Sequence, residues 1–133
     1  MVEINAYSKA KDGGKKLSTN FTVKEFACKD GSDTVLVAPR LVMVLQSIRS
    51  RFGAAVTINS GYRTPQYNAK VGGVAHSQHC YGTAADIAVR GQKPAAVAAY
   101  ARELMPDWGG VGVYAGQGFT HIDVRETRSD WNG

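Results

Sequence analysis

Hydrophobic residues recur at helical spacing between residues 39 and 52, with the arginines of this segment mostly outside the apolar stripe. The apolar positions fall on one face: Leu41, Leu45, Ile48 and Phe52. Pro39 suits the first turn of a helix, and Gly53 suits the residue just after its end. The pattern therefore predicts a core helix over residues 39–52.

Shorter patterns predict the other elements. Thr22 and Glu25 form a capping-box pattern, which indicates a short helix, and residues 29–34 resemble a turn. An Ala-rich segment at 94–104 is typical of a second helix. Strands are expected at four places: residues 55–59, 84–89, 111–114 and 119–124.

The order of these elements is helix, strand, long loop over residues 60–83, strand, helix and hairpin. This order favours an α+β domain with a small, mainly antiparallel sheet flanked by helices. We find no linker or internal repeat, so residues 1–133 are expected to form a single domain. Residues 1–17 are polar and carry four lysines, which predicts a loosely ordered basic arm.

Composition adds limits to this picture. The chain has 133 residues, 44% hydrophobic and 20% charged, which is typical of a globular domain. A net charge of +5 indicates a basic surface or a polyanionic partner, such as nucleic acid or an anionic wall polymer. No aromatic residues interleave with the N-terminal lysines, so nucleic acid is not expected as a partner. A monomer is expected.

No apolar run reaches the length of a signal peptide or a membrane span, which predicts synthesis in the cytoplasm and no membrane insertion. Cys28 and Cys80 are the two cysteines. Whether they pair stays open at this point.

Strand alternation places several polar side chains on one side of the sheet. In residues 119–124, His121 and Asp123 share a face opposite an apolar one, and in residues 84–89 Asp86 does the same. Because the apolar faces must point to the core, these three side chains are expected to face a cleft. His79 lies seven residues before Asp86, at the end of the long loop.

Two imidazoles and one carboxylate can fill three corners of a zinc tetrahedron and leave the fourth open, as in catalytic sites. His79, Asp86 and His121 are thus candidate ligands of one Zn²⁺. Two structural alternatives remain on spacing alone: a histidine that serves only as a hydrogen-bonded strand residue, and an aspartate that pairs with an arginine.

One segment resembles a known family. Residues 77–86, SQHCYGTAAD, match the S-x-H-x-x-G-x-A-x-D motif of zinc D-Ala-D-Ala carboxypeptidases and murein endopeptidases, and residues 121–123 are similar to their later H-x-D segment. Residues 60–65, Asn68 and residues 71–73 resemble the small branch associated with phages and bacteria. The resemblance implies a hedgehog-like metallopeptidase fold over about residues 17–131, and zinc on His79, Asp86 and His121.

The same resemblance implies further roles. Arg63 matches the arginine that contacts the substrate carbonyl or carboxylate in relatives, although it could also brace its loop by a salt bridge. Tyr62 is expected beside it as a substrate contact. Ser77 is expected to orient the substrate or to brace the loop around His79.

The general base is less clear. Relatives often carry Glu or Asp three residues before the last zinc histidine, and here that position is Gly118. Asp123, on the same strand face as His121, is the predicted base, or else it only holds a ligand or substrate by hydrogen bonds. His76 is another candidate for proton transfer. Cys80 could be a thiol nucleophile, but as a neighbour of His79 it is expected to pack inward.

These residues predict a zinc metallopeptidase that hydrolyses an amide bond in peptidoglycan stem peptides. Both a D-Ala-D-Ala carboxypeptidase and a murein endopeptidase fit, and a phage or prophage lysis enzyme that reaches the cell wall after release is a suitable setting. The alternative is a catalytically silent zinc-binding or wall-binding module of a phage or bacterial particle. DNA binding through the basic arm is a third hypothesis, which predicts salt-sensitive retention.

Overall fold

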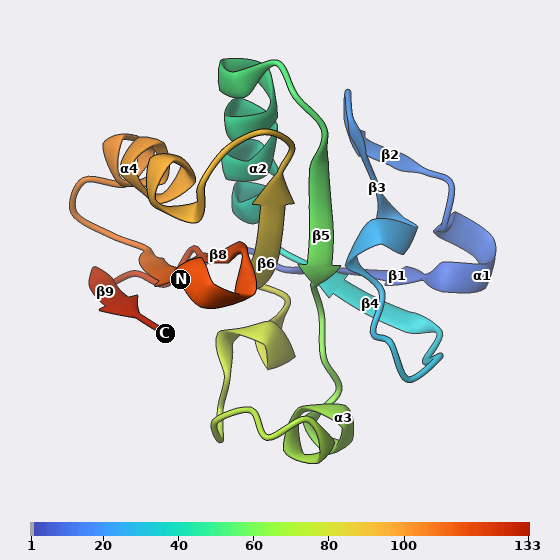
Figure 1. The fold of residues 1–133 in the computed structure, drawn as a ribbon. Helices are drawn as coiled ribbons and strands as arrows, with labels where there is room; N and C mark the ends of the chain where they lie inside the picture. The colour runs from blue at the N-terminus through green and yellow to red at the C-terminus, as the bar shows by residue number, and fades with distance from the viewer. Residues whose placement is uncertain (1) are drawn as a thin grey trace.

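A five-stranded sheet forms the centre of the computed structural model, which describes residues 2–133 (Figure 1). Its strand order is β5-β6-β8-β7-β9, and all neighbours are antiparallel except the parallel pair β7–β9. The strands are β5 (Val56–Ser60), β6 (Ala84–Val89), β8 (Phe119–Asp123), β7 (Gly110–Tyr114) and β9 (Ser129–Asn132). The predicted α+β class is confirmed.

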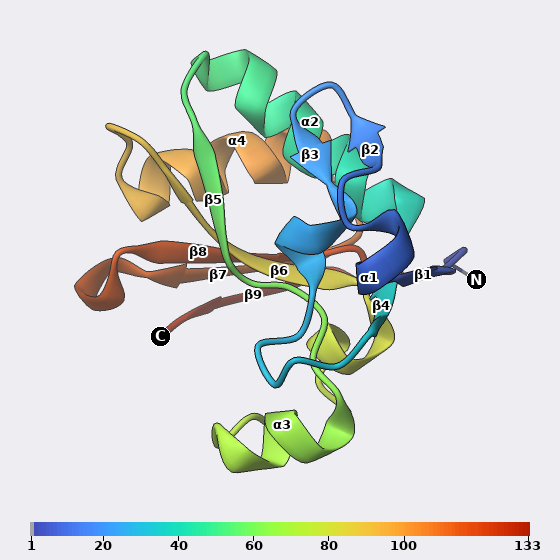
Figure 2. The ribbon, with the colours of Figure 1, turned by 90° about the vertical axis from the view of Figure 1, so that its right-hand side faces the viewer.

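Two helices cover one face of this sheet: α2 (Pro39–Phe52) and α4 (Pro94–Leu104). Figure 2 shows both on the same side of β6, β7 and β8. The α2 residues predicted to share an apolar face include Leu41, Leu45 and Ile48, each at most 1% exposed. They pack with Ile87 of β6 and Ile122 of β8 in the core. The apolar strand faces therefore point to the helices, and the opposite face is free to carry polar groups.

The N-terminal residues differ from the loosely ordered arm that was expected. They form β1 (Asn5–Ser8), α1 (Lys9–Asp12) and β2 (Lys16–Ser18). β1 pairs with β4 (Thr34–Val37), and β2 pairs with β3 (Phe21–Thr22). Asp33 holds the arm in place, since its carboxylate accepts hydrogen bonds from the Ser8 hydroxyl and the Ala10 backbone N–H. Lysine spacing could not reveal this long-range pairing.

Several smaller expectations are refined by the structure. The capping box at Thr22 and Glu25 is present, and it starts a 3-10 turn, η1 (Val23–Phe26). The long loop over residues 60–83 contains α3 (Pro65–Lys70) and the 3-10 turn η2 (Gln78–Tyr81). Another 3-10 turn, η3 (Ala115–Gln117), joins β7 to β8. Within residues 2–133, no helix combines the length and apolar character needed to cross a membrane.

Candidate metal centre

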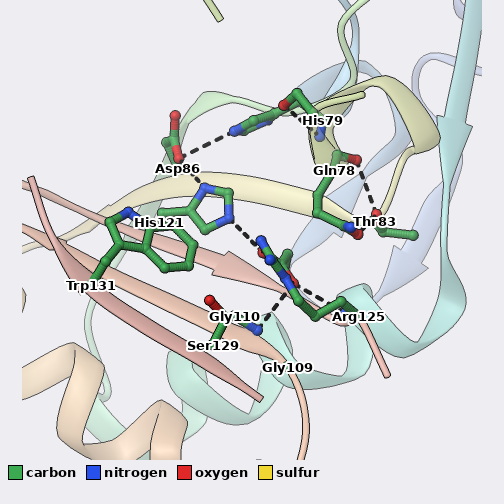
Figure 3. Close-up of polar contacts among 12 residues, drawn as sticks. Gln78, His79, Thr83, Asp86, Gly109, Gly110, His121, Arg125, Ser129 and Trp131 are labelled. Carbon is green, nitrogen blue, oxygen red and sulfur yellow. Dashed lines mark hydrogen bonds and ion pairs between the residues drawn. The ribbon is translucent and has the colours of Figure 1, made fainter. Parts of the chain in front are cut away.

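Three elements bring His79, Asp86 and His121 together on the face of the sheet away from α2 and α4. His79 lies in η2, Asp86 in β6 and His121 in β8, and the last two are directly opposite each other in the antiparallel register. One ligand atom from each residue lies within 4.8 Å of the others. Asp86 Oδ1 is 3.0 Å from His121 Nδ1 and 3.3 Å from His79 Nε2 (Figure 3).

Both imidazoles are held from behind by their other nitrogen. His79 Nδ1 donates a hydrogen bond to the Gly61 carbonyl at 2.8 Å. His121 Nε2 donates one to Asp123 Oδ2, also at 2.8 Å. These bonds fix which nitrogen carries the proton in the neutral rings, so that His79 Nε2 and His121 Nδ1 present lone pairs to the space shared with Asp86.

The three groups need a cation between them. Burial opposes ionisation of Asp86, whereas contact with His121 and His79, when these rings carry a second proton, holds its pKa well below the ordinary value. The carboxylate is therefore charged, and it faces two nitrogens whose rings already donate their protons elsewhere. Either a second proton on each ring or one metal ion satisfies this arrangement. The residues thus fit a metal, because ligand atoms about 2.0–2.1 Å from a tetrahedral zinc lie about 3.3 Å apart.

A cavity of about 620 Å³ opens beside these residues. Most of the residues that border it come from the long loop over residues 60–83, the β7–β8 hairpin and β9. They include His79, Asp86, His121, Arg63, Ser77, Gln78, Val71, Val74, Tyr114, Gln117, Phe119, Arg125, Ser129 and Trp131. The group therefore has an open side, which a purely structural metal site would lack.

Arg63 borders the cavity beside the candidate ligands. Its Nε donates to Ser60 Oγ at 3.0 Å, and its Nη1 donates to Asn68 Oδ1 at 3.2 Å. Its Nη2 lies 3.5 Å from Asp86 Oδ2, in a long ion pair. Ser60 and Asn68 thus fix the guanidinium plane at the border of the cavity, where a planar anion could bind.

Asp123 does not fit the predicted role of general base. Its side chain is on the expected strand face but is 0% exposed, and it does not border the cavity. Oδ1 accepts hydrogen bonds from the Gly110 and Arg125 backbone N–H groups, and Oδ2 accepts them from His121 and Arg125 Nη2. Although burial opposes its charge, the bonds from His121 and Arg125 lower its pKa. Asp123 therefore lies behind His121, and the geometry matches the alternative of a group that holds a ligand.

Gly110 makes this burial possible. A Cβ at position 110 would lie 2.2 Å from Asp123 Oδ2, so only glycine leaves room for the carboxylate against β7. The Asp123 contact also acts on His121: burial disfavours the charged imidazole, while Asp123 and Asp86 raise its pKa. His121 is thereby an electron-rich ring with a fixed orientation.

The other sequence candidates are placed as follows. The Ser77 hydroxyl accepts a hydrogen bond from the His79 backbone N–H at 3.2 Å, and Ser77 also borders the cavity. Tyr62 is buried and does not border it, so the expected contact with substrate has no support in this geometry.

Burial and the nearby Cys28 and Cys80 thiols raise the pKa of Tyr62. Both thiols are free.

His76 and the cavity wall complete the comparison. His76 is exposed and does not border the cavity, so this geometry gives no support to a role in proton transfer there. Sequence reasoning missed Tyr114, Arg125 and Trp131, which all border the cavity. Trp131 gave one usable signal, as an aromatic residue in an otherwise polar C-terminal segment.

Comparisons with known proteins agree with this site. A family model described as Peptidase M15 matches residues 19–123, which contain all three candidate ligands. A zinc D-Ala-D-Ala carboxypeptidase from Streptomyces albus G is 41% identical over 59 residues. That match covers 44% of this chain and 23% of the Streptomyces protein, so the chain spans less than a quarter of that relative's length. The His-Asp-His group is consistent with a single zinc site.

Proposed function

Because this chain belongs to the peptidase M15 family, we propose that it is a zinc peptidase that hydrolyses an amide bond in peptidoglycan stem peptides. His79, Asp86 and His121 would hold the zinc ion. The observation that carries the proposal is the convergence of these three ligand atoms, two of them on imidazoles fixed from behind, at the open side of a cavity.

Each residue contributes a defined part. When bound, zinc supplies Lewis-acid activation of a water nucleophile and of the scissile carbonyl. Arg63 would bind a carboxylate of the substrate, since its guanidinium is fixed by Ser60 and Asn68 and borders the cavity. Asp123 and the Gly61 carbonyl hold the two imidazoles in the orientation that presents their lone pairs. A cell-wall peptide supplies both the amide bond and the carboxylates that this site requires.

The test uses the purified full chain, a synthetic stem peptide ending in D-Ala-D-Ala, and cross-linked peptidoglycan. We expect release of D-Ala or of new amines that stops when a chelator removes the metal and returns when zinc is added. Release of D-Ala alone would indicate a carboxypeptidase, and new amines from cross-linked wall would indicate an endopeptidase. No zinc-dependent release from either substrate would contradict the proposal.

One observation favours a second candidate, a catalytically silent zinc-binding or wall-binding module. Among residues 2–133, Asp86 is the one carboxylate that borders the cavity, and position 118 is glycine. The site thus lacks a carboxylate base on its open side. Zinc binding and retention on peptidoglycan without any hydrolysis would select this alternative.

Replacing Arg63 with Lys is expected to lower kcat/KM for the stem peptide by about 10- to 100-fold, mainly through a higher KM. Lysine keeps the charge but cannot donate to Ser60, Asn68 and an anion from one plane. Steady-state kinetics on the D-Ala-D-Ala peptide measure the effect. Arg90→Lys is the matched control, because Arg90 is exposed in the turn after β6. Equal kinetics for Arg63→Lys and the control would exclude a bidentate role for Arg63.

A further inference from the structure

Three aromatic residues from the β7–β8 hairpin and β9 line one side of the cavity: Tyr114, Phe119 and Trp131. The rings of Tyr114 and Phe119 are stacked, 4.4 Å apart and 11° from parallel. Trp131 Nε1 donates a hydrogen bond to the Tyr114 hydroxyl oxygen at 2.9 Å. The stack on Phe119 therefore holds the ring of Tyr114, and the hydrogen bond from Trp131 holds its hydroxyl oxygen.

Trp131 links this wall to the candidate metal ligands. Its ring lies 5.0 Å from the imidazole of His121, and Figure 3 shows the two side by side. A Cβ at Gly112 would lie 2.5 Å from the indole, so glycine there leaves room for Trp131 against β7. Trp131 thus contacts both the Tyr114 oxygen and the His121 ring, and this wall lies across the strand order β5-β6-β8-β7-β9 from Arg63, which follows β5.

The direction of the Tyr114 proton follows from the chemistry of tryptophan. An indole N–H can only donate, so the phenol oxygen accepts in the Trp131 contact and its own O–H must point elsewhere. No side chain or carbonyl in residues 2–133 accepts a hydrogen bond from that O–H. The phenol therefore has a donor that is held in place and remains available to a molecule in the cavity.

The two charged donors that border the cavity already have partners: Arg125 binds both oxygens of Asp123, and Arg63 is held by Ser60 and Asn68. A neutral, fixed donor is the type of group that stabilises negative charge as it develops on a carbonyl oxygen.

We propose that Tyr114 is a catalytic residue whose O–H donates a hydrogen bond to the oxygen of the scissile carbonyl as negative charge builds on it, and that Trp131 is the positioning residue that aims it. No proton is transferred in this step. The inference rests on the proposed peptidase function and adds to it the second stabiliser of the transition state, beside the metal.

The test compares wild-type protein with Tyr114→Phe, which keeps the ring and its stack on Phe119 but removes the O–H. We expect kcat for the stem peptide to fall by about 10²- to 10³-fold with KM changed less than about 3-fold, as for other donors to a developing oxyanion. Affinity for a phosphinate analogue of D-Ala-D-Ala, which resembles the tetrahedral transition state, should fall by a similar factor. Zinc content and thermal unfolding should match the wild type.

Trp131→Phe supplies the positioning test. It keeps an aromatic ring beside His121 and removes the N–H, so kcat should fall less, by about 10-fold, while zinc content is retained. Tyr7→Phe is the control, since it removes a phenol O–H from β1, outside this cavity.

The outcomes separate the two levels of the proposal. Wild-type protein that binds zinc but hydrolyses no peptide would overturn the peptidase function and this inference with it. Active wild-type protein together with a Tyr114→Phe variant of equal kcat and equal phosphinate affinity would overturn the inference alone. A fall in kcat that comes with loss of zinc would also contradict it, because that result assigns Tyr114 a structural role.

Discussion

Replacing His121 with alanine is expected to leave the protein without bound zinc and to lower peptide hydrolysis by at least about 10³-fold. Only three side chains in residues 2–133 form the candidate metal group, so the variant retains two ligands, too few for a tightly held zinc. The expected fall in rate corresponds to several kcal/mol of transition-state stabilisation, which the bound metal would supply and the variant would lose. Zinc per chain after gel filtration and turnover of the stem peptide measure both effects.

A second ligand variant separates loss of metal from loss of fold. His121 lies between Asp86 and Asp123, and its removal leaves two carboxylates without their shared partner. His79→Ala leaves Asp123 intact and should give the same loss of zinc and activity. His76→Asn is the matched control, because His76 is exposed, lies outside the cavity and has a left-handed backbone conformation that asparagine tolerates. Full zinc content in either alanine variant would show that another group holds the metal.

The parts of the site that sequence could predict depend on short-range geometry. Alternation along a strand has a period of two, so the apolar positions Ile87 and Ile122 determine the side on which Asp86 and His121 lie. Antiparallel pairing of β6 with β8 then brings the two polar residues opposite each other. The helix over residues 39–52 was equally predictable, since its spacing, proline start and glycine end all agree.

The parts that sequence could not predict depend on long-range packing. The cavity wall needs β9 to pair in parallel with β7, and the polar residues of β9 give little sign of a strand. Alternation placed Asp123 on the same face as His121, but it could not show that Arg125 folds back and covers the carboxylate. The basic N-terminal segment was wrongly expected to be loose for a similar reason, because Asp33 is distant in sequence from the residues that it holds.

Replacing Asp123 with asparagine is expected to weaken zinc binding by about 10- to 100-fold, as found when groups that orient a metal-binding histidine are changed. An amide can accept at its oxygen only, so its NH₂ group must face a donor, either His121 Nε2–H or Arg125. The free energy of unfolding should also fall by about 2 kcal/mol. A larger loss is not expected, because Arg125 is 31% exposed and water can replace part of the contact. Zinc affinity by competition with a chelator and unfolding by denaturant measure these changes.

The same variant decides between the two roles of Asp123. A buried carboxylate that orients His121 predicts that turnover returns to near the wild-type level once zinc saturates the variant. A general base predicts unchanged zinc affinity and no turnover at any zinc concentration, because the proton acceptor itself is gone. Asp107→Asn, at an exposed aspartate, controls for the change of charge. Since both Asp123 oxygens are bound by donors and neither reaches the cavity, we expect recovery with zinc, and unrecovered turnover would return Asp123 to the role of base.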